Sequence, residues 1–68
     1  MAANFVIYKV HYNDERGFYQ LKPGESMTEA IERAARNLRR IGRPDGITFQ
    51  HCVGDVVDAI VASAKLIG

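Results

Sequence analysis

The sequence lacks the features that mark secreted and membrane proteins. Its 68 residues include one cysteine, Cys52, so no disulfide can form within the chain. No stretch approaches the roughly 20 apolar residues that span a bilayer. The N-terminus has neither the basic segment nor the long apolar segment of a signal peptide. We therefore expect a reduced, cytoplasmic setting without membrane contact, which for a virus-encoded protein is the cytoplasm of the host.

An excess of charge of one sign is also missing. Nine lysines and arginines stand against eight aspartates and glutamates, for a net charge of +1, so no global field directs the protein to nucleic acid or to a membrane. The 47% hydrophobic and 25% charged residues are typical of a globular protein. We expect one domain over residues 1–68, whose small core makes association a plausible source of extra stability.

The N-terminal part of the chain has the alternation of a β-hairpin. β-forming side chains fall on alternate faces over residues 5–12, and the pattern resumes over residues 18–22. The polar cluster at residues 13–17 ends in a glycine and is typical of a turn. These signals predict two antiparallel strands over residues 5–22.

A capping box predicts the start of a helix. The Ser26 hydroxyl and the Glu29 carboxylate have the spacing at which each accepts from the backbone amide of the other. Apolar residues follow at helical spacing, and Gly42 and Pro44 are stop signals. The sequence predicts a helix over residues 27–41.

The C-terminal third predicts another strand and another helix. Residues 47–53 alternate, and Asp55 has the properties of a helix N-cap. Nine of the twelve residues at 56–67 are apolar, more than one helix stripe requires. Their β-branched side chains leave a strand open as the alternative.

These elements predict an α+β fold in the order β-β-α-β-α, with a three-stranded sheet and a helix on each face. A hairpin, a helix and a strand in this order resemble the opening of ubiquitin-like β-grasp domains. The hairpin followed by the Thr28-Glu29-Ala30 helix also resembles the opening of HicB-type antitoxins. We expect the middle helix to pack on side chains that share one sheet face: Val6, Tyr8, Val10, Tyr19, Leu21, Ile47 and Phe49.

A cluster of five arginines lies along the predicted middle helix and just beyond its end. At 100° per residue they lie opposite its apolar stripe, and Glu29 and Glu32 stand one turn before the first two. Guanidinium groups match both carboxylates and phosphates. The cluster is a candidate site for an acidic protein surface or for nucleic acid, and a solvated helix face is the simpler interpretation. We call it the arginine face: Arg33, Arg36, Arg39, Arg40 and Arg43.

The last helix and the neighbouring sheet face are candidates for self-association. The apolar side chains of Phe5, Ile7 and Phe18 are predicted to lie on the sheet face away from the middle helix. In one interpretation Val56, Ile60 and Ile67 of the same chain cover them, and in the other a second molecule does. One side of the last helix has no partner in either case. We predict a homodimer with these candidate residues: Val57, Val61, Ala64, Phe5, Ile7 and Phe18.

No catalytic or metal-binding pattern is present. His51 and Cys52 are adjacent in a predicted strand and point to opposite faces, so with His11 they do not make a zinc site or a nucleophile pair. We therefore expect no enzyme, no metal and no cofactor. Small proteins without catalytic groups often act as inhibitors or adaptors, including those carried by phages. We predict protein binding, with nucleic-acid binding as the alternative.

Overall fold

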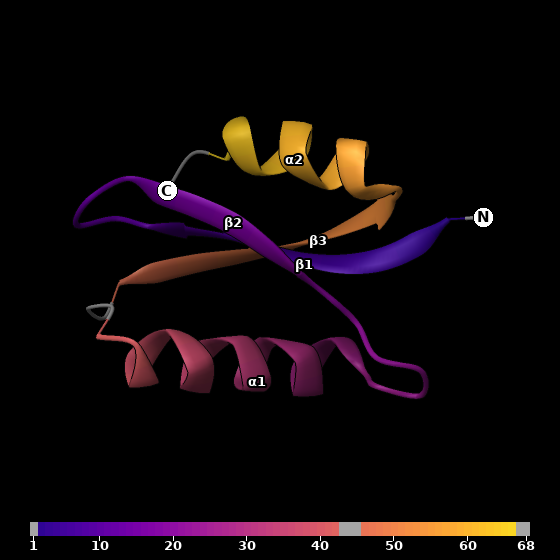
Figure 1. Ribbon diagram of the computed structural model, residues 1–68, viewed down its shortest axis with the longest axis horizontal. Helices are drawn as coiled ribbons and strands as arrows, with labels where there is room; N and C mark the ends of the chain where they lie inside the picture. The colour runs from indigo at the N-terminus through magenta and orange to yellow at the C-terminus, as the bar shows by residue number, and fades with distance from the viewer. Residues whose placement is uncertain (1, 43–45, 67–68) are drawn as a thin grey trace.

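The α+β class is confirmed by a computed structural model, which describes residues 2–42 and 46–66. A three-stranded antiparallel sheet lies between two helices, α1 on one side and α2 on the other (Figure 1). Residues 56–64 form a helix rather than a strand. The elements are β1 (Ala3–Val10), β2 (Glu15–Gln20), α1 (Met27–Arg40), β3 (Ile47–Gly54) and α2 (Val56–Ala64).

The central strand of the sheet is β1, and the strand order is β2-β1-β3. Tyr8 pairs with Gly17 of β2 and with Phe49 of β3. Asp14 makes the tight turn between β1 and β2 with a φ of 59°, a conformation that aspartate tolerates better than most residues. Both β2 and β3 are therefore edge strands.

The capping box of α1 forms as predicted. The Glu29 amide donates to the Ser26 hydroxyl at 3.1 Å, and the Ser26 amide donates to the Glu29 carboxylate at 3.0 Å. The helix ends where Gly42 takes a φ of 84°. Pro44, the other predicted stop signal, lies outside the described residues. The buried stripe of α1 is Ala30, Ala34 and Leu38.

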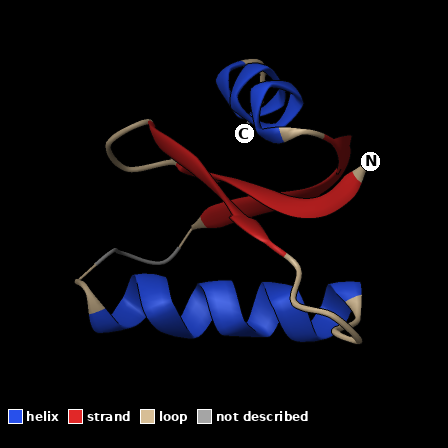
Figure 2. Cartoon of the chain, turned by 45° about the vertical axis from the view of Figure 1, so that its right-hand side comes forward, coloured by secondary structure: helices blue, strands red, loops and turns tan. Residues whose placement is uncertain are grey.

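The longer helix, α1, runs along one side of the sheet (Figure 2). Its main contacts there are with β1 and β2. Val6 and Val10 of β1 are fully buried. Ile47 and Phe49 of β3, which were predicted to lie under this helix, are only half-buried. The α1 side of β3 is therefore partly open.

The rotation of α2 differs from the prediction. Its buried residues are Ala59 and Ser63, and Ala59 forms a cluster with Leu66, Phe5 and Ile7. The large rings of β1 and β2 fill the space between sheet and helix, so only small helix side chains fit there. The prediction that Val56 and Ile60 cover this face is wrong, since both are about half exposed. Ile67 lies outside the described residues.

Candidate functional site

The outer face of α2 is an uncovered apolar surface. We define this face as Val56, Val57, Ile60, Val61 and Ala64. The four larger side chains are between 45% and 65% exposed, and Ala64 is exposed as well. Val57, Val61 and Ala64, predicted for self-association, therefore lie on the surface.

The other three predicted self-association residues do not lie on that surface. Phe5 and Ile7 are buried beneath α2 of the same chain, and Phe18 packs against their cluster. The Phe5 and Phe18 rings meet edge to face, with their centroids 5.7 Å apart. Because the chain covers Phe5 and Ile7 itself, these two side chains offer no surface to a second molecule, and Phe18 is partly covered as well.

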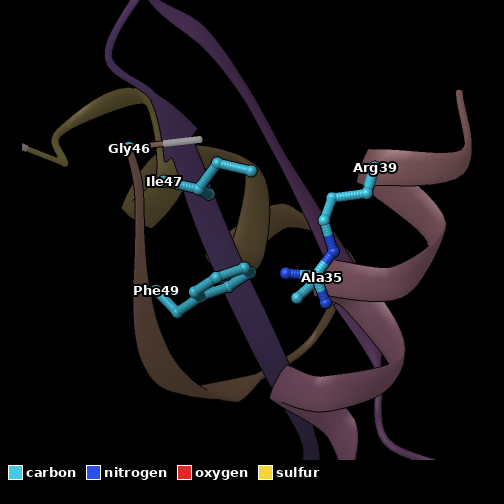
Figure 3. A pocket seen from close by; sticks show the side chains of 5 residues that line it. All are labelled: Ala35, Arg39, Gly46, Ile47 and Phe49. Atoms are coloured by element: carbon cyan, nitrogen blue, oxygen red, sulfur yellow. The ribbon is translucent and has the colours of Figure 1, made fainter. Parts of the chain in front are cut away.

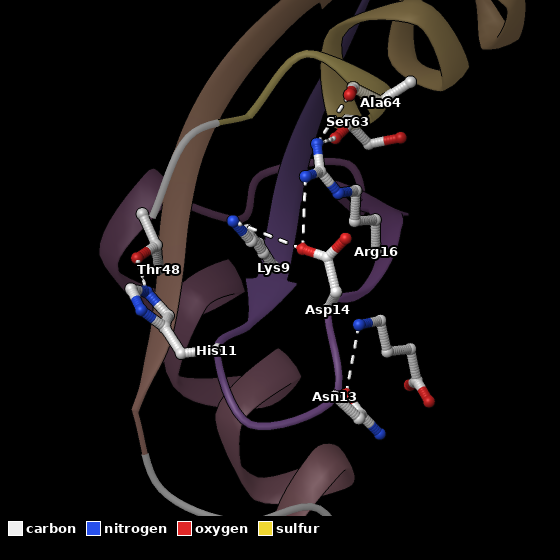
Figure 4. Close-up of polar contacts among 9 residues, drawn as sticks. Lys9, His11, Asn13, Asp14, Arg16, Thr48, Ser63 and Ala64 are labelled. Atoms are coloured by element: carbon white, nitrogen blue, oxygen red, sulfur yellow. Dashed lines mark hydrogen bonds and ion pairs between the residues drawn. The ribbon is translucent and has the colours of Figure 1, made fainter.

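Both ends of α2 are held in place. Asp55 and Asp58 form a second capping box, with the two amide-to-carboxylate distances at 2.9 Å. At the other end, Arg16 of β2 donates to the carbonyl oxygens of Ser63 at 3.3 Å and Ala64 at 2.5 Å (Figure 4). The outer face is thus presented by a helix with hydrogen bonds at both of its ends.

Arg33 has partners that differ from the predicted one. Its guanidinium donates to Glu25 at 2.9 Å and to the Gln20 carbonyl at 2.9 Å, and it lies 5.9 Å from the centroid of the Tyr19 ring. The predicted partner, Glu29, is occupied by the capping box. Arg33 therefore joins α1 to the end of β2 and is not a free cation.

The rest of the arginine face is less engaged. Arg40 donates to Asn37 at 2.6 Å. Within residues 2–42 and 46–66, no carboxylate forms an ion pair with Arg36, Arg39 or Arg40. Arg43 lies outside the described residues. The available cations of this face are thus Arg36, Arg39 and Arg40.

The ion pair of Glu25 and Arg33 predicts a pH effect. The hydrogen bond from Arg33, followed by one from the Lys22 amide, lowers the pKa of Glu25 from its ordinary value of 4.5 to about 2. A lowered pKa stabilises the fold above pH 4.5, and this contribution disappears as the pH falls toward about 2. Glu25→Gln should therefore lower the thermal midpoint at neutral pH, and the difference from the parent should vanish near pH 2. Parallel thermal melts of both proteins measure it.

The matched control for this prediction is Glu32→Gln. Glu32 is exposed and, among the described residues, forms no ion pair. Its replacement should leave the midpoint nearly unchanged at every pH. A difference for Glu25→Gln that persists unchanged at pH 2 would show that the carboxylate charge is not responsible.

An open hollow of about 160 Å³ lies between α1 and β3. Its lining residues are Ala35 and Arg39 of α1, together with Gly46, Ile47 and Phe49. The Arg39 guanidinium and the Phe49 ring come from opposite walls (Figure 3). Sequence reasoning placed Ile47 and Phe49 in the core and missed this site, because no local pattern reports which strands a helix covers.

The two histidines and the cysteine contact different parts of the molecule. His11 contacts the Thr48 hydroxyl (Figure 4), and His51 contacts the Asn4 side-chain oxygen at 2.8 Å. Cys52 packs against the cluster that includes Phe5. No three histidine, cysteine or acidic side chains among the described residues gather closely enough to hold a metal ion.

Comparisons with protein-family models, with curated proteins and with solved structures found no match for this chain. In the part of the chain that the structure describes, neither helix has the length and apolar character needed to cross a membrane. The function must therefore be argued from the surfaces of the molecule.

Proposed function

We propose that the protein is a small, non-enzymatic interaction module that acts by binding proteins and associates with itself. The observation that carries this proposal is the outer face of α2, where four branched aliphatic side chains are about half exposed. Contiguous apolar surfaces of this kind mark contact sites in soluble proteins. An inhibitor or adaptor role fits a domain whose candidate functional features are contact surfaces.

A second copy of the chain is the occupant that we propose for the outer face of α2. The five residues of this face carry no charge, so two copies can bring identical apolar faces together without like-charge repulsion. One face of a nine-residue helix is small beside the roughly 800 Å² that each partner buries in a standard interface. We therefore expect a weak, concentration-dependent dimer.

Sedimentation velocity over a concentration series tests the dimer. The parent chain should move from monomer to dimer as concentration rises toward about 1 mM. The double variant Val57→Lys, Val61→Lys should remain monomeric, because each lysine places an ammonium group in the apolar contact. Circular dichroism should show an unchanged fold, since both residues are exposed.

The matched control is Val53→Lys. Val53 is 58% exposed, as much as the α2 valines, but it lies on β3. This variant should dimerise like the parent. A parent that stays monomeric throughout, or dimerisation lost in Val53→Lys and kept in the α2 double variant, contradicts the proposed contact.

Nucleic-acid binding through the arginine face is the second candidate function. Arg36 and Arg39 support it, because neither forms an ion pair with a described carboxylate. Two observations weigh against it: Arg33 is held by Glu25, and the ring of Phe5 is buried, so it cannot stack on a base. Single-strand binding relies on exposed aromatic rings beside cations, so we favour an acidic protein surface as the partner of these arginines.

A further inference from the structure

The strand β3 lies at an edge of the sheet, so no strand among the described residues pairs with the backbone groups of its outer side. The His11 amide donates to the Gly46 carbonyl, and the β1–β3 register continues from this pair. Because backbone groups alternate in direction along an antiparallel strand, Thr48, Gln50 and Cys52 bond to β1. The N–H and C=O groups of the alternate residues point outward, and these are Ile47, Phe49, His51 and Val53.

This edge is also unprotected by side chains. Edge strands are commonly blunted by lysine, proline or short length, but β3 runs for eight residues, ITFQHCVG, without lysine, proline or a carboxylate. The other edge strand, β2, is shorter, and its Gln20 carbonyl already accepts from Arg33. Of the two edge strands, β3 is therefore the better suited to pair with an added strand.

The hollow lies beside this edge. An added strand places the side chains opposite Ile47 and Phe49 on the same sheet face as those residues, which is the α1 face. Since α1 packs over β1 and β2, such a side chain meets the hollow rather than a helix. The group that it meets there is the Arg39 guanidinium (Figure 3).

We propose that the β3 edge binds an extended acidic segment of a partner protein, which joins the sheet as a fourth strand and places a carboxylate on Arg39. Strand addition supplies affinity through backbone hydrogen bonds, and a side-chain site supplies selectivity. Charge complementarity favours an acidic segment over a second copy, because β3 itself has no carboxylate to offer Arg39. The inference rests on the proposed function, protein binding, because it takes the bound segment to belong to a protein.

The test uses the full chain, labelled with ¹⁵N, and two blocked peptides of about seven residues. Both alternate threonine and valine, and one has a central glutamate where the other has lysine. The glutamate peptide should shift the amide signals of Ile47, Phe49, His51 and Val53 and slow their hydrogen exchange. The lysine peptide should bind up to about fivefold more weakly, the effect of one exposed ion pair.

Three variants separate the parts of this site. Arg39→Glu should reverse the preference between the two peptides. Arg40→Glu, one position along, should not, because Arg40 does not line the hollow. His51→Pro should abolish binding of both peptides and leave the fold intact, because it removes an outward N–H that does not bond to β1.

Each contrary result overturns the proposal. Equal binding of the two peptides removes the role of Arg39. Protection of the β3 amides that grows with protein concentration, without peptide, assigns the edge to a second copy. Salt-sensitive binding of an oligothymidylate in place of the peptides assigns the arginines to nucleic acid. If neither peptide binds, strand addition at β3 is refuted. That result does not bear on the α2 dimer, which sedimentation tests separately.

Discussion

Replacing Phe5 by alanine should lower the free energy of unfolding by about 4 kcal/mol. Phe5 is 1% exposed and lies between β1 and α2, where it contacts Ile7, Ala59 and Leu66. The truncation removes the ring from the cluster and also removes its edge-to-face contact with Phe18. Helix and sheet are fixed by their own hydrogen bonds, so they cannot collapse fully into the cavity.

Urea denaturation followed by circular dichroism measures this loss. A 68-residue domain is expected to have a stability of about 3 to 10 kcal/mol, so Phe5→Ala should lose a large fraction of it and should be largely unfolded at room temperature if the parent lies at the low end of this range. Tyr12→Ala is the control, because Tyr12 is an aromatic residue of the same hairpin that is 83% exposed. The control should change stability by less than about 0.5 kcal/mol. Equal losses in both variants would contradict the buried position of Phe5.

Ala59→Asp should destabilise the protein by about 3 kcal/mol or more, and Ile60→Asp should do so by less than about 1 kcal/mol. Ala59 is fully buried in the apolar cluster that contains Phe5 and Ile7. The carboxylate of an aspartate at this position would lose its hydration and have apolar neighbours in its place. Ile60 is 52% exposed, and its carboxylate would remain hydrated. Thermal unfolding of the two variants gives the comparison.

This pair of variants also distinguishes two orientations of α2. The apolar pattern of the sequence predicts Ile60 inside, and the structure places Ala59 there. If Ile60→Asp proved the more damaging change, the helix would be rotated toward the sequence-based prediction. Both substitutions change the net charge by the same amount, and alanine and isoleucine differ in helix propensity by less than about 0.7 kcal/mol. These effects are too small to explain a difference of about 2 kcal/mol.

Local signals predicted the elements of the fold well. Ser26 and Glu29 mark the start of α1 correctly because capping depends only on residues three apart. The predicted first strand began at Phe5, whereas β1 begins at Ala3, which pairs with Gly54. That pairing joins opposite ends of the sequence, and no alternation at the N-terminus could report it.

The candidate site depended on contacts that local signals do not contain. Hydropathy ranks Val56 and Ile60 above Ala59 as core residues, but the size of the Phe5 and Phe18 rings leaves room only for small helix side chains. Likewise, i,i+4 spacing assigned Glu29 to Arg33. The loop before α1 instead brings Glu25 to that guanidinium. Packing volume and loop path decided both outcomes.

The contact between Arg16 and the end of α2 has a consequence for the order of folding. It joins positions separated by 47 and 48 residues in the sequence, and α2 has no basic residue in its own last turn. A nine-residue helix is too short to persist alone in water. The carbonyl groups of Ser63 and Ala64 gain the Arg16 donor only once the hairpin has formed. Among the described elements, α2 should therefore be the last to form.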